Sequence, residues 1–424
     1  MNLSKELANT IVDPQAFAYW DKSHAAFSEI RKMESRPLAE PDGYDPFWVV
    51  SRHDEILEVE RQNELFHNGD RSTTVATRDA LEKVKQITGG SVHLVRSLVQ
   101  MDNPDHMDYR RLTQGWFMPQ NLRSLEERIR EIAREFVDVM LSFDGECDFA
   151  RDVAFLFPLR VVMEVIGVPQ ADEPRMLKLT QELFGAADTD VNRTGELGTS
   201  EDDRVAMLNE TVADFFAYFT AMTEDRRANP REDLASVIAN GQINGDPLGH
   251  VEAMSYYIIA ATAGHDTTSA STAGTGWALA EFPDQFRKIK EDMSLMPGLL
   301  EESIRWETPV KHFMRTATAD TELAGRKIAE GDWLMLSYPS GNRDETKFDR
   351  PFEFDLTRMP NKHVSFGYGA HVCLGQHLAR MEMRILWEEL LPKLKSLELN
   401  GQPTRVAANF VSGPKSVPVK FTKE

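Results

Sequence analysis

The sequence contains little cysteine: only Cys147 and Cys373 among its 424 residues are cysteine, and they lie far apart along the chain. Two cysteines cannot build a framework of disulfide bonds, so we expect a reducing compartment. Positive charge is also in deficit, with 48 Lys and Arg against 68 Asp and Glu and a formal net charge of −20. This balance argues against a nucleic-acid partner, because phosphate binding requires clustered positive charge.

Long hydrophobic runs and targeting signals are missing as well. The longest nearly apolar stretch, MSYYIIAATAG at 254–264, is too short to cross a membrane. Residues 1–20 do not begin with a basic segment followed by an apolar run, so they do not resemble a signal peptide. We therefore expect a cytoplasmic protein without a membrane span.

Helical periodicity dominates what is present. Apolar residues recur at three- and four-residue steps in the ranges 125–143, 209–228 and 376–397. Strand signals are short and lie in the ranges 46–52 and 316–338, where turn residues divide the apolar stretches. These proportions predict a mainly α protein with a smaller β region.

The most polar interior stretch, Gly185–Asp203, lies between two helical patterns. A loop of this length inside a compact domain is either mobile or functional. A lid over a pocket and a disordered surface insertion both remain open. The chain has no low-complexity linker and no repeat of fixed period, so nothing in it marks a domain boundary.

The surroundings of Cys373 differ from those of Cys147, which we interpret as an inert buried residue. Gly367 and Gly369 precede Cys373 and Gly375 follows it, so the backbone can turn tightly and a large group can approach. A strong helical pattern begins directly afterwards. A thiolate at this position would face the unpaired amide N–H groups of the helix start.

Three chemistries compete for this cysteine. As a nucleophile, Cys373 would need a general base, for which His371 or His377 could serve. As a zinc ligand, it would have only the nearby histidines as companions, which is a poor set. As the axial ligand of a haem iron, it needs open backbone and an apolar wall, which Phe366 could provide.

A second unusual cluster interrupts the helical pattern at 263–267. Gly264 costs about 1 kcal/mol in a helix relative to alanine. Asp266 and Thr267 are poor helix formers, and the hydroxyl of Thr267 can bond back to the carbonyl of Ala263. A purely structural helix would gain nothing from these residues, whereas a site that delivers protons into a dry pocket would.

The stretch from Phe366 to Gly375 resembles the haem-ligand signature of the cytochrome P-450 superfamily of haem-thiolate monooxygenases. The resemblance implies haem b with the Cys373 thiolate as its metal ligand, and Phe366, Gly367 and Ala263 beside the cofactor. The range 263–267 is similar to the oxygen-activation motif of this family. That similarity implies that Thr267 hydrogen-bonds dioxygen and that Asp266 belongs to the proton relay.

Further positions match the family in order along the chain. Four side chains match positions that bind the haem propionates: His106, Arg110, Arg315 and His371. His363 is a weaker candidate that we interpret as structural. Glu302 and Arg305 resemble the family's Glu-x-x-Arg pair, and Arg358 matches the arginine that completes this network, so we assign these three residues to folding.

The resemblance implies one triangular-prism domain, residues 1–424, that inserts one atom of dioxygen into a substrate. No Gly-x-Gly-x-x-Gly opens a βαβ unit and no cysteine cluster could hold iron and sulfur, so electrons must come from other proteins. The family implies a small iron–sulfur ferredoxin and its NAD(P)H-dependent flavin reductase. Arg110, Arg111 and Arg380 flank the expected docking face.

The expected substrate pocket is apolar and is lined by Ile259, Ala263, Val310, Phe313, Phe410 and Val411. The chain looks most like bacterial terpineol-type monooxygenases, which implies a terpene or an aromatic hydrocarbon as substrate. The alternatives are a peroxygenase, a non-catalytic thiolate-haem ligand-binding or sensor protein, and a haem-free cysteine hydrolase. The acid–threonine pair argues against the first two, and the lack of a visible oxyanion hole argues against the third.

Overall fold

The computed structural model describes residues 2–34, 36–196 and 200–424. Its α-helices are α1 (Lys5–Thr10), α2 (Pro14–Ala18), α3 (Trp20–Arg31), α4 (His53–Arg61), α5 (Arg78–Thr88), α6 (Asp105–Gln114), α7 (Pro119–Leu122), α8 (Glu126–Ser142), α9 (Leu156–Ile166), α10 (Glu173–Phe184), α11 (Glu201–Ala228), α12 (Leu234–Ala239), α13 (His250–Glu281), α14 (Pro283–Glu291), α15 (Met296–Glu307), α16 (Tyr338–Gly341) and α17 (Gln376–Leu390). Its strands are β1 (Leu38–Ala39), β2 (Phe47–Val50), β3 (Phe66–His67), β4 (Glu146–Asp148), β5 (Gln242–Ile243), β6 (Asp246–Pro247), β7 (His312–Ala317), β8 (Thr321–Leu323), β9 (Arg326–Ile328), β10 (Trp333–Ser337), β11 (Leu394–Leu399), β12 (Thr404–Arg405), β13 (Pro414–Ser416) and β14 (Pro418–Lys423).

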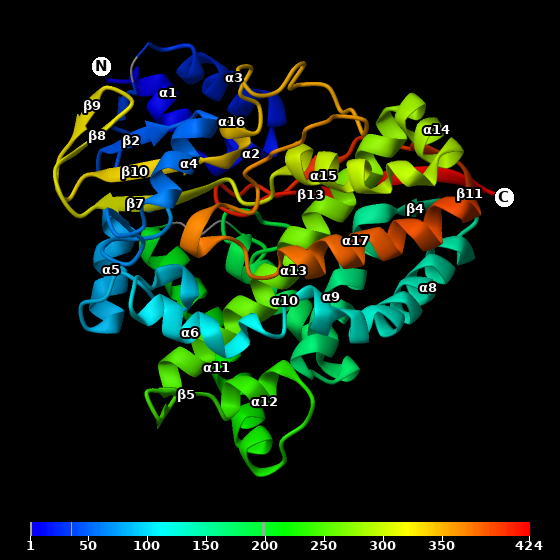
Figure 1. The fold of residues 1–424 in the computed structure, drawn as a ribbon, viewed down its shortest axis with the longest axis horizontal. Helices are drawn as coiled ribbons and strands as arrows, with labels where there is room; N and C mark the ends of the chain where they lie inside the picture. Colours follow the sequence, from blue (N-terminus) through cyan, green and yellow to red (C-terminus); the bar gives the residue numbers. More distant parts are fainter. Residues whose placement is uncertain (1, 35, 197–199) are drawn as a thin grey trace.

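The predicted mainly α protein with a smaller β region is confirmed (Figure 1). A five-stranded sheet has the order β1-β2-β10-β7-β3, in which β10 runs parallel to β2 and antiparallel to β7. In β10, Trp333 and Met335 belong to the core under the N-terminal helices, whereas Leu334 and Leu336 belong to the core on the other side. This alternation follows from the two-residue period of a strand.

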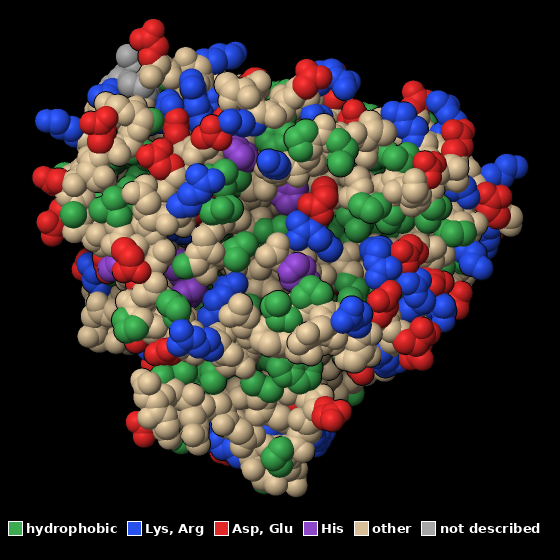
Figure 2. Space-filling model, in the orientation of Figure 1, with side chains coloured by type: hydrophobic (Ala, Val, Ile, Leu, Met, Phe, Trp, Pro, Cys, Tyr) green, Lys and Arg blue, Asp and Glu red, His purple; other side chains and the backbone are tan. Residues whose placement is uncertain are grey.

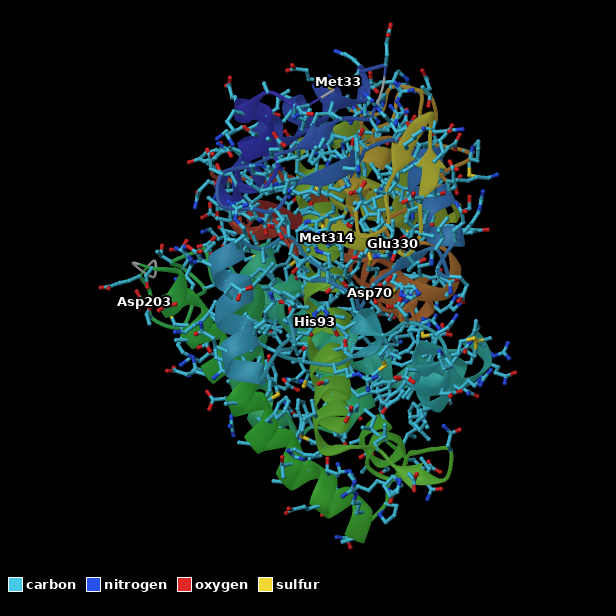
Figure 3. All side chains as sticks on the ribbon, turned by 90° about the vertical axis from the view of Figure 1, so that its left-hand side faces the viewer. Met33, Asp70, His93, Asp203, Met314 and Glu330 are labelled. Carbon is cyan, nitrogen blue, oxygen red and sulfur yellow. The ribbon has the colours of Figure 1, made fainter. Side chains whose placement is uncertain are left out.

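Most of the remainder is helical, and the largest core lies between these helices and the small sheet β11-β14-β4. Figure 3 shows α13 and α11 as long helices that extend below the sheet, and Met314 of β7 marks the buried part of that sheet. Helix α13 is continuous over 32 residues and packs along α9. Among the described residues, no helix has both the length and the apolarity to cross a membrane.

Gly264 has a packing role that the sequence analysis did not foresee. A Cβ atom at this position would lie 3.0 Å from Cγ2 of Val162 on α9. Glycine therefore allows α13 and α9 to approach closely. The sequence analysis judged the whole cluster unhelpful to a structural helix, but for this glycine the structure adds a packing reason, because a side chain here would crowd Val162.

Two predicted boundaries also differ from the structure. The periodic range 376–397 ends as a helix at Leu390, because Pro392 lacks the N–H that would continue it. The last residues of that range instead enter β11, which pairs with β14. The polar stretch 185–203 is shorter than expected, since α11 begins at Glu201, and residues 197–199 of it lie outside the described residues.

The first part of the polar stretch 185–203 forms hydrogen bonds and an ion pair with the C-terminal segment. Asp188 is buried, accepts a hydrogen bond from the backbone N–H of Ala407 at 2.9 Å, and pairs with Nζ of Lys415 at 2.8 Å. These contacts argue against a free surface insertion at this end of the stretch.

Candidate active site

Cys373 lies in the loop that precedes α17. Its backbone N–H donates to the carbonyl of Phe366 at 2.8 Å, which closes a tight loop around the two intervening glycines. Gly367 and Gly369 have φ angles of 65° and 70°, a region that favours glycine. A Cβ atom on Gly369 would also lie 2.2 Å from the carbonyl oxygen of Glu60. The glycines are therefore needed for the turn and for its packing against α4.

The sulfur of Cys373 lies where the first amides of α17 point. Burial raises the pKa of the Cys373 thiol, while the backbone N–H groups of Gly375 and Gln376 and the charge of Arg110 act in the opposite direction. These groups stabilise a thiolate, and a bound cation would favour it further. The helix start thus provides the environment that the sequence predicted.

Cys147 has a different environment. It lies in β4 opposite Val419 of β14, and burial, with Asp152 and Asp148 nearby, raises the pKa of its thiol to about 12. A thiol of this pKa stays protonated at neutral pH and is a poor ligand or nucleophile.

A cluster of cations and imidazoles lies close to the cysteine loop. The ring of His106 of α6 packs against that of His371, with ring centroids 3.9 Å apart and an interplanar angle of 33°. Burial lowers the pKa of His371 to about 2, and the charge of Arg315 of β7, together with His106 and Arg110, adds to this effect. Arg110 also donates to the carbonyl of Val372 at 2.8 Å. The structure thus brings together all four side chains that the sequence assigned to propionate binding.

His106 has an unusual deficit of hydrogen bonds. Both of its ring nitrogens are buried and have no partner within the described part of the chain. Burial lowers the pKa of His106 to about 4, with a further contribution from Arg110, so the ring is neutral at pH 7. An unsatisfied buried polar atom costs about 1–3 kcal/mol, which indicates that an acceptor from outside the chain belongs here.

The acid–threonine pair lies on α13. The hydroxyl of Thr267 donates to the carbonyl of Ala263 at 2.8 Å, the back-bond that the sequence allowed. Asp266 is mostly buried, and its Oδ2 atom has no hydrogen-bond partner among the described residues. A hydroxyl and an unpartnered carboxylate oxygen are therefore adjacent along the helix.

His265, the residue between glycine and acid, connects three helices. Its Nε2 lies 3.0 Å from the carbonyl of Phe155, just before α9, and so carries the hydrogen. Its Nδ1 lies 3.2 Å from the hydroxyl of Thr180 on α10. His265 therefore holds this part of α13 in place from two sides.

Sequence reasoning missed Glu382 of α17. Its side chain is fully buried, burial raises its pKa well above the ordinary value, and it hydrogen-bonds to Thr268 of α13. A signal for it existed in the sequence, because Glu382 lies on the apolar stripe of α17 together with Leu378 and Ile385. Burial therefore favours the protonated form of this carboxyl group relative to an exposed glutamate.

The predicted structural residues form one buried network. Glu302 and Arg305 are completely buried and share two hydrogen bonds of 2.7 Å. Nε of Arg358 donates to Glu302 at 3.1 Å, and Nη1 of Arg305 donates to the carbonyls of Asn342 and Pro351. This network connects α15 to the segment that leads to the cysteine loop.

The expected docking arginines are engaged in contacts of their own. Arg380 forms hydrogen bonds of 2.6 and 2.9 Å with Glu301 and covers the ring of Phe366, and Arg111 pairs with Asp108. Figure 2 shows positive and negative side chains intermingled over the face that α8 and α17 form. Carboxylates therefore neutralise Arg111 and Arg380, whereas Arg110 donates to the carbonyl of Val372.

His363, which we interpret as structural, has a buried side chain whose Nε2 lies 3.1 Å from Oε2 of Glu301. The interaction joins the segment before the cysteine loop to α15.

The predicted pocket residues fall into two groups. Val310 and Val411 form a β-bridge, and the rings of Phe313 and Phe410 lie 5.4 Å apart. Ile259 of α13 packs instead against the largest core, and Ala263 lies one turn further along that helix. A hollow of about 50 Å³, lined in part by Val411 and Asp266, lies between the C-terminal segment and α13.

Comparison with known proteins identifies the family. The family model of Cytochrome P450 matches residues 71–421. The chain is 46% identical over 421 residues to "Cytochrome P450-terp" of Pseudomonas sp, covering 99% of this chain and 98% of that protein. It is 31% identical over 399 residues to "Linalool 8-monooxygenase" of Pseudomonas putida, covering 93% and 95%. The crystal structure of CYP108D1 from Novosphingobium aromaticivorans superimposes with a TM-score of 0.91, at 46% identity and full coverage of both chains.

The chain belongs to the cytochrome P450 family, as its sequence motifs led us to expect. It is a P450 monooxygenase, and the cofactor of this family is haem b with a cysteine thiolate as axial ligand. The residues present fit that cofactor, since a propionate group would accept the hydrogen bond that the N–H of His106 lacks, and two propionates would place negative charge beside Arg110 and Arg315.

Proposed function

We propose that the protein oxidises a terpene or a compact aromatic hydrocarbon, with residues 1–424 acting as one haem-binding domain and Cys373 as the axial ligand. The observation that carries the proposal is the placement of Cys373 at the amides of α17, beside the cluster of His106, His371, Arg110 and Arg315. Cys147 is a poor alternative ligand because it lies within a strand with its thiol protonated.

Different residues would hold the iron and the propionates of the cofactor. Cys373 would bind the iron, and the four propionate-binding side chains would hold the carboxylates. Phe366, Gly367 and Ala263 would lie beside the ring system, as the motif implies. When bound, the haem supplies the oxidising chemistry that cleaves dioxygen and attacks the substrate.

Side chains of α13 and α17 would supply the protons that the reaction consumes. Thr267 can turn its hydroxyl away from the Ala263 carbonyl and donate a hydrogen bond to dioxygen, and Asp266 can exchange a proton through its unpartnered Oδ2. The carboxyl group of Glu382, whose pKa burial raises, lies beside Thr268 and would add a second proton-exchanging group near the same turn.

The substrate class follows from the apolar side chains and the relatives. Val310, Phe313, Phe410 and Val411 form an aromatic and aliphatic wall without a charged member. Such a wall excludes water and favours a hydrocarbon over a polar substrate. One relative is named a linalool monooxygenase and another P450-terp, which supports a compound of terpene size.

The electrons would come from a small iron–sulfur ferredoxin and its NAD(P)H-dependent reductase, in the cytoplasm. Support comes from the sequence, which has neither a flavin or nicotinamide fingerprint nor a cysteine cluster of its own. Because Arg111 and Arg380 are already paired, the partner would have to exchange these ion pairs or bind by other contacts.

Two spectroscopic measurements test the proposal. The reduced protein should show a strongly red-shifted Soret band with carbon monoxide, and Cys373→Ser should lose it. A spin-shift titration with a panel of terpenes and arenes should then give saturable binding for compact hydrocarbons and none for polar analogues of similar size. Binding of neither class would refute the proposed substrate, and an unshifted Soret band would refute the proposed ligand.

A further inference from the structure

Glu60, in the last turn of α4, is a buried carboxyl group that the proposed chemistry leaves unused. The hydroxyl of Tyr338 donates to its Oε1 at 2.7 Å, and Nη2 of Arg315 lies 3.7 Å from the same oxygen. Its Oε2 is buried and has no hydrogen-bond partner among the described residues. The carboxyl group also packs against the cysteine loop, where a Cβ atom on Gly367 would lie 3.1 Å from Oε1.

The surroundings of Glu60 make its protonated and ionised forms similar in free energy near neutral pH. Burial raises its pKa to about 7, against the opposing effects of Arg315, Tyr338 and the backbone N–H of Tyr368. These are the charged and polar groups that face it from β7, α16 and the cysteine loop. Burial raises the pKa of Tyr338 well above its ordinary value, so Tyr338 remains a donor throughout the neutral range.

Arg315 connects this carboxyl group to the proposed propionate site. The same guanidinium that faces Glu60 also lowers the pKa of His371. A propionate at Arg315 would place a second carboxylate beside the cation that now stabilises ionised Glu60. Two carboxylates that share one cation in a buried site favour protonation of one of them.

We propose that Glu60 is a positioning residue for the cofactor: it orients Arg315 and takes up one proton from water when the bound haem gains one electron from a one-electron donor. The inference rests on the proposed function, since it requires the propionates at Arg315. The added electron and the added proton leave the net charge of the site unchanged. Glu60 thereby offsets negative charge that Arg315 alone cannot balance.

The pH dependence of the haem reduction potential tests this proposal. In the wild-type protein the potential should fall as pH rises through the neutral range, with a limiting slope of about 59 mV per pH unit for one proton per electron. Glu60→Gln should flatten the slope over this range. A redox difference infrared spectrum should show a protonated carboxyl band that Glu60→Gln lacks. An unchanged slope in Glu60→Gln would overturn the proposal and assign the proton to the propionates or to His106 and His371.

Two further variants keep the test decisive. Tyr338→Phe keeps the carboxyl group but removes a donor to its charged form, so the sloping region should move to higher pH, and an unmoved region contradicts the proposal. Glu55→Gln is the matched control, because Glu55 is a buried carboxyl of the same helix that pairs with Arg36 instead of Arg315. It should leave the slope unchanged. The carbon monoxide spectrum of each variant reports thiolate ligation separately, so a failure of the proposed function would be recognised independently.

Discussion

Arg305→Met should be among the most damaging single substitutions in the chain. The change removes two hydrogen bonds of 2.7 Å to Glu302 and two of 2.9 Å to the carbonyls of Asn342 and Pro351. Removal of one partner from a buried ion pair costs about 3–5 kcal/mol, because the other charge stays buried. Arg358 continues to donate to Glu302, which keeps the loss within that range.

Urea unfolding, followed by loss of the Soret band at equal haem loading, measures this effect. With a urea m-value of about 3 kcal/mol/M, the midpoint should fall by about 1–1.7 M. Arg350→Met is the matched control: Arg350 pairs with Glu353, Asp349 and Asp355, but its side chain is exposed, so solvent screens these pairs and the midpoint should shift far less. Equal shifts for the two variants would refute the argument that burial determines the cost.

Three further outcomes follow from the site. Cys373→His should fold but lose monooxygenation, and full activity would remove the thiolate from the mechanism. Thr267→Ala should divert reducing equivalents to hydrogen peroxide while Thr267→Ser, which keeps the hydroxyl, should not; unchanged coupling of NADH use to product in Thr267→Ala would contradict the proton relay. The third outcome concerns the carboxyl group of Glu301. Burial acts to raise its pKa, but hydrogen bonds from Arg380 and His363 outweigh burial and lower the pKa to about 2. Its stabilising contribution is therefore complete above pH 4.5 and is lost as pH falls towards 2, so Glu301→Gln should make the urea midpoint less sensitive to acid in that range.

The sequence predicted contacts between residues that lie close together along the chain. The back-bond of Thr267 depends on residues four apart on one helix, and the Glu302–Arg305 pair on residues three apart. The amides that face Cys373 belong to the helix that follows it directly. Each of these contacts is short-range along the chain, so spacing and residue type were sufficient to predict it.

Contacts between distant segments could not be predicted in this way. Glu60 and Arg315 are separated by 255 positions, and neither residue is unusual in its own stretch of sequence. The neutralisation of Arg380 depends on Glu301 of another helix, and the role of Gly264 depends on Val162. Each of these contacts joins two segments that only the folded chain brings together. The sequence alone therefore does not reveal whether such a side chain is buried or paired.

The unpartnered ring nitrogens of His106 have a simple physical explanation. Both are buried and have no hydrogen-bond partner among the described residues. At about 1–3 kcal/mol for each such atom, the chain alone is less stable than its apolar packing would allow. The imidazole and guanidinium groups near the cysteine loop require acceptors and negative charge, which a haem carries as propionates. Binding energy from these groups is therefore available both to hold the cofactor and to stabilise the fold around it.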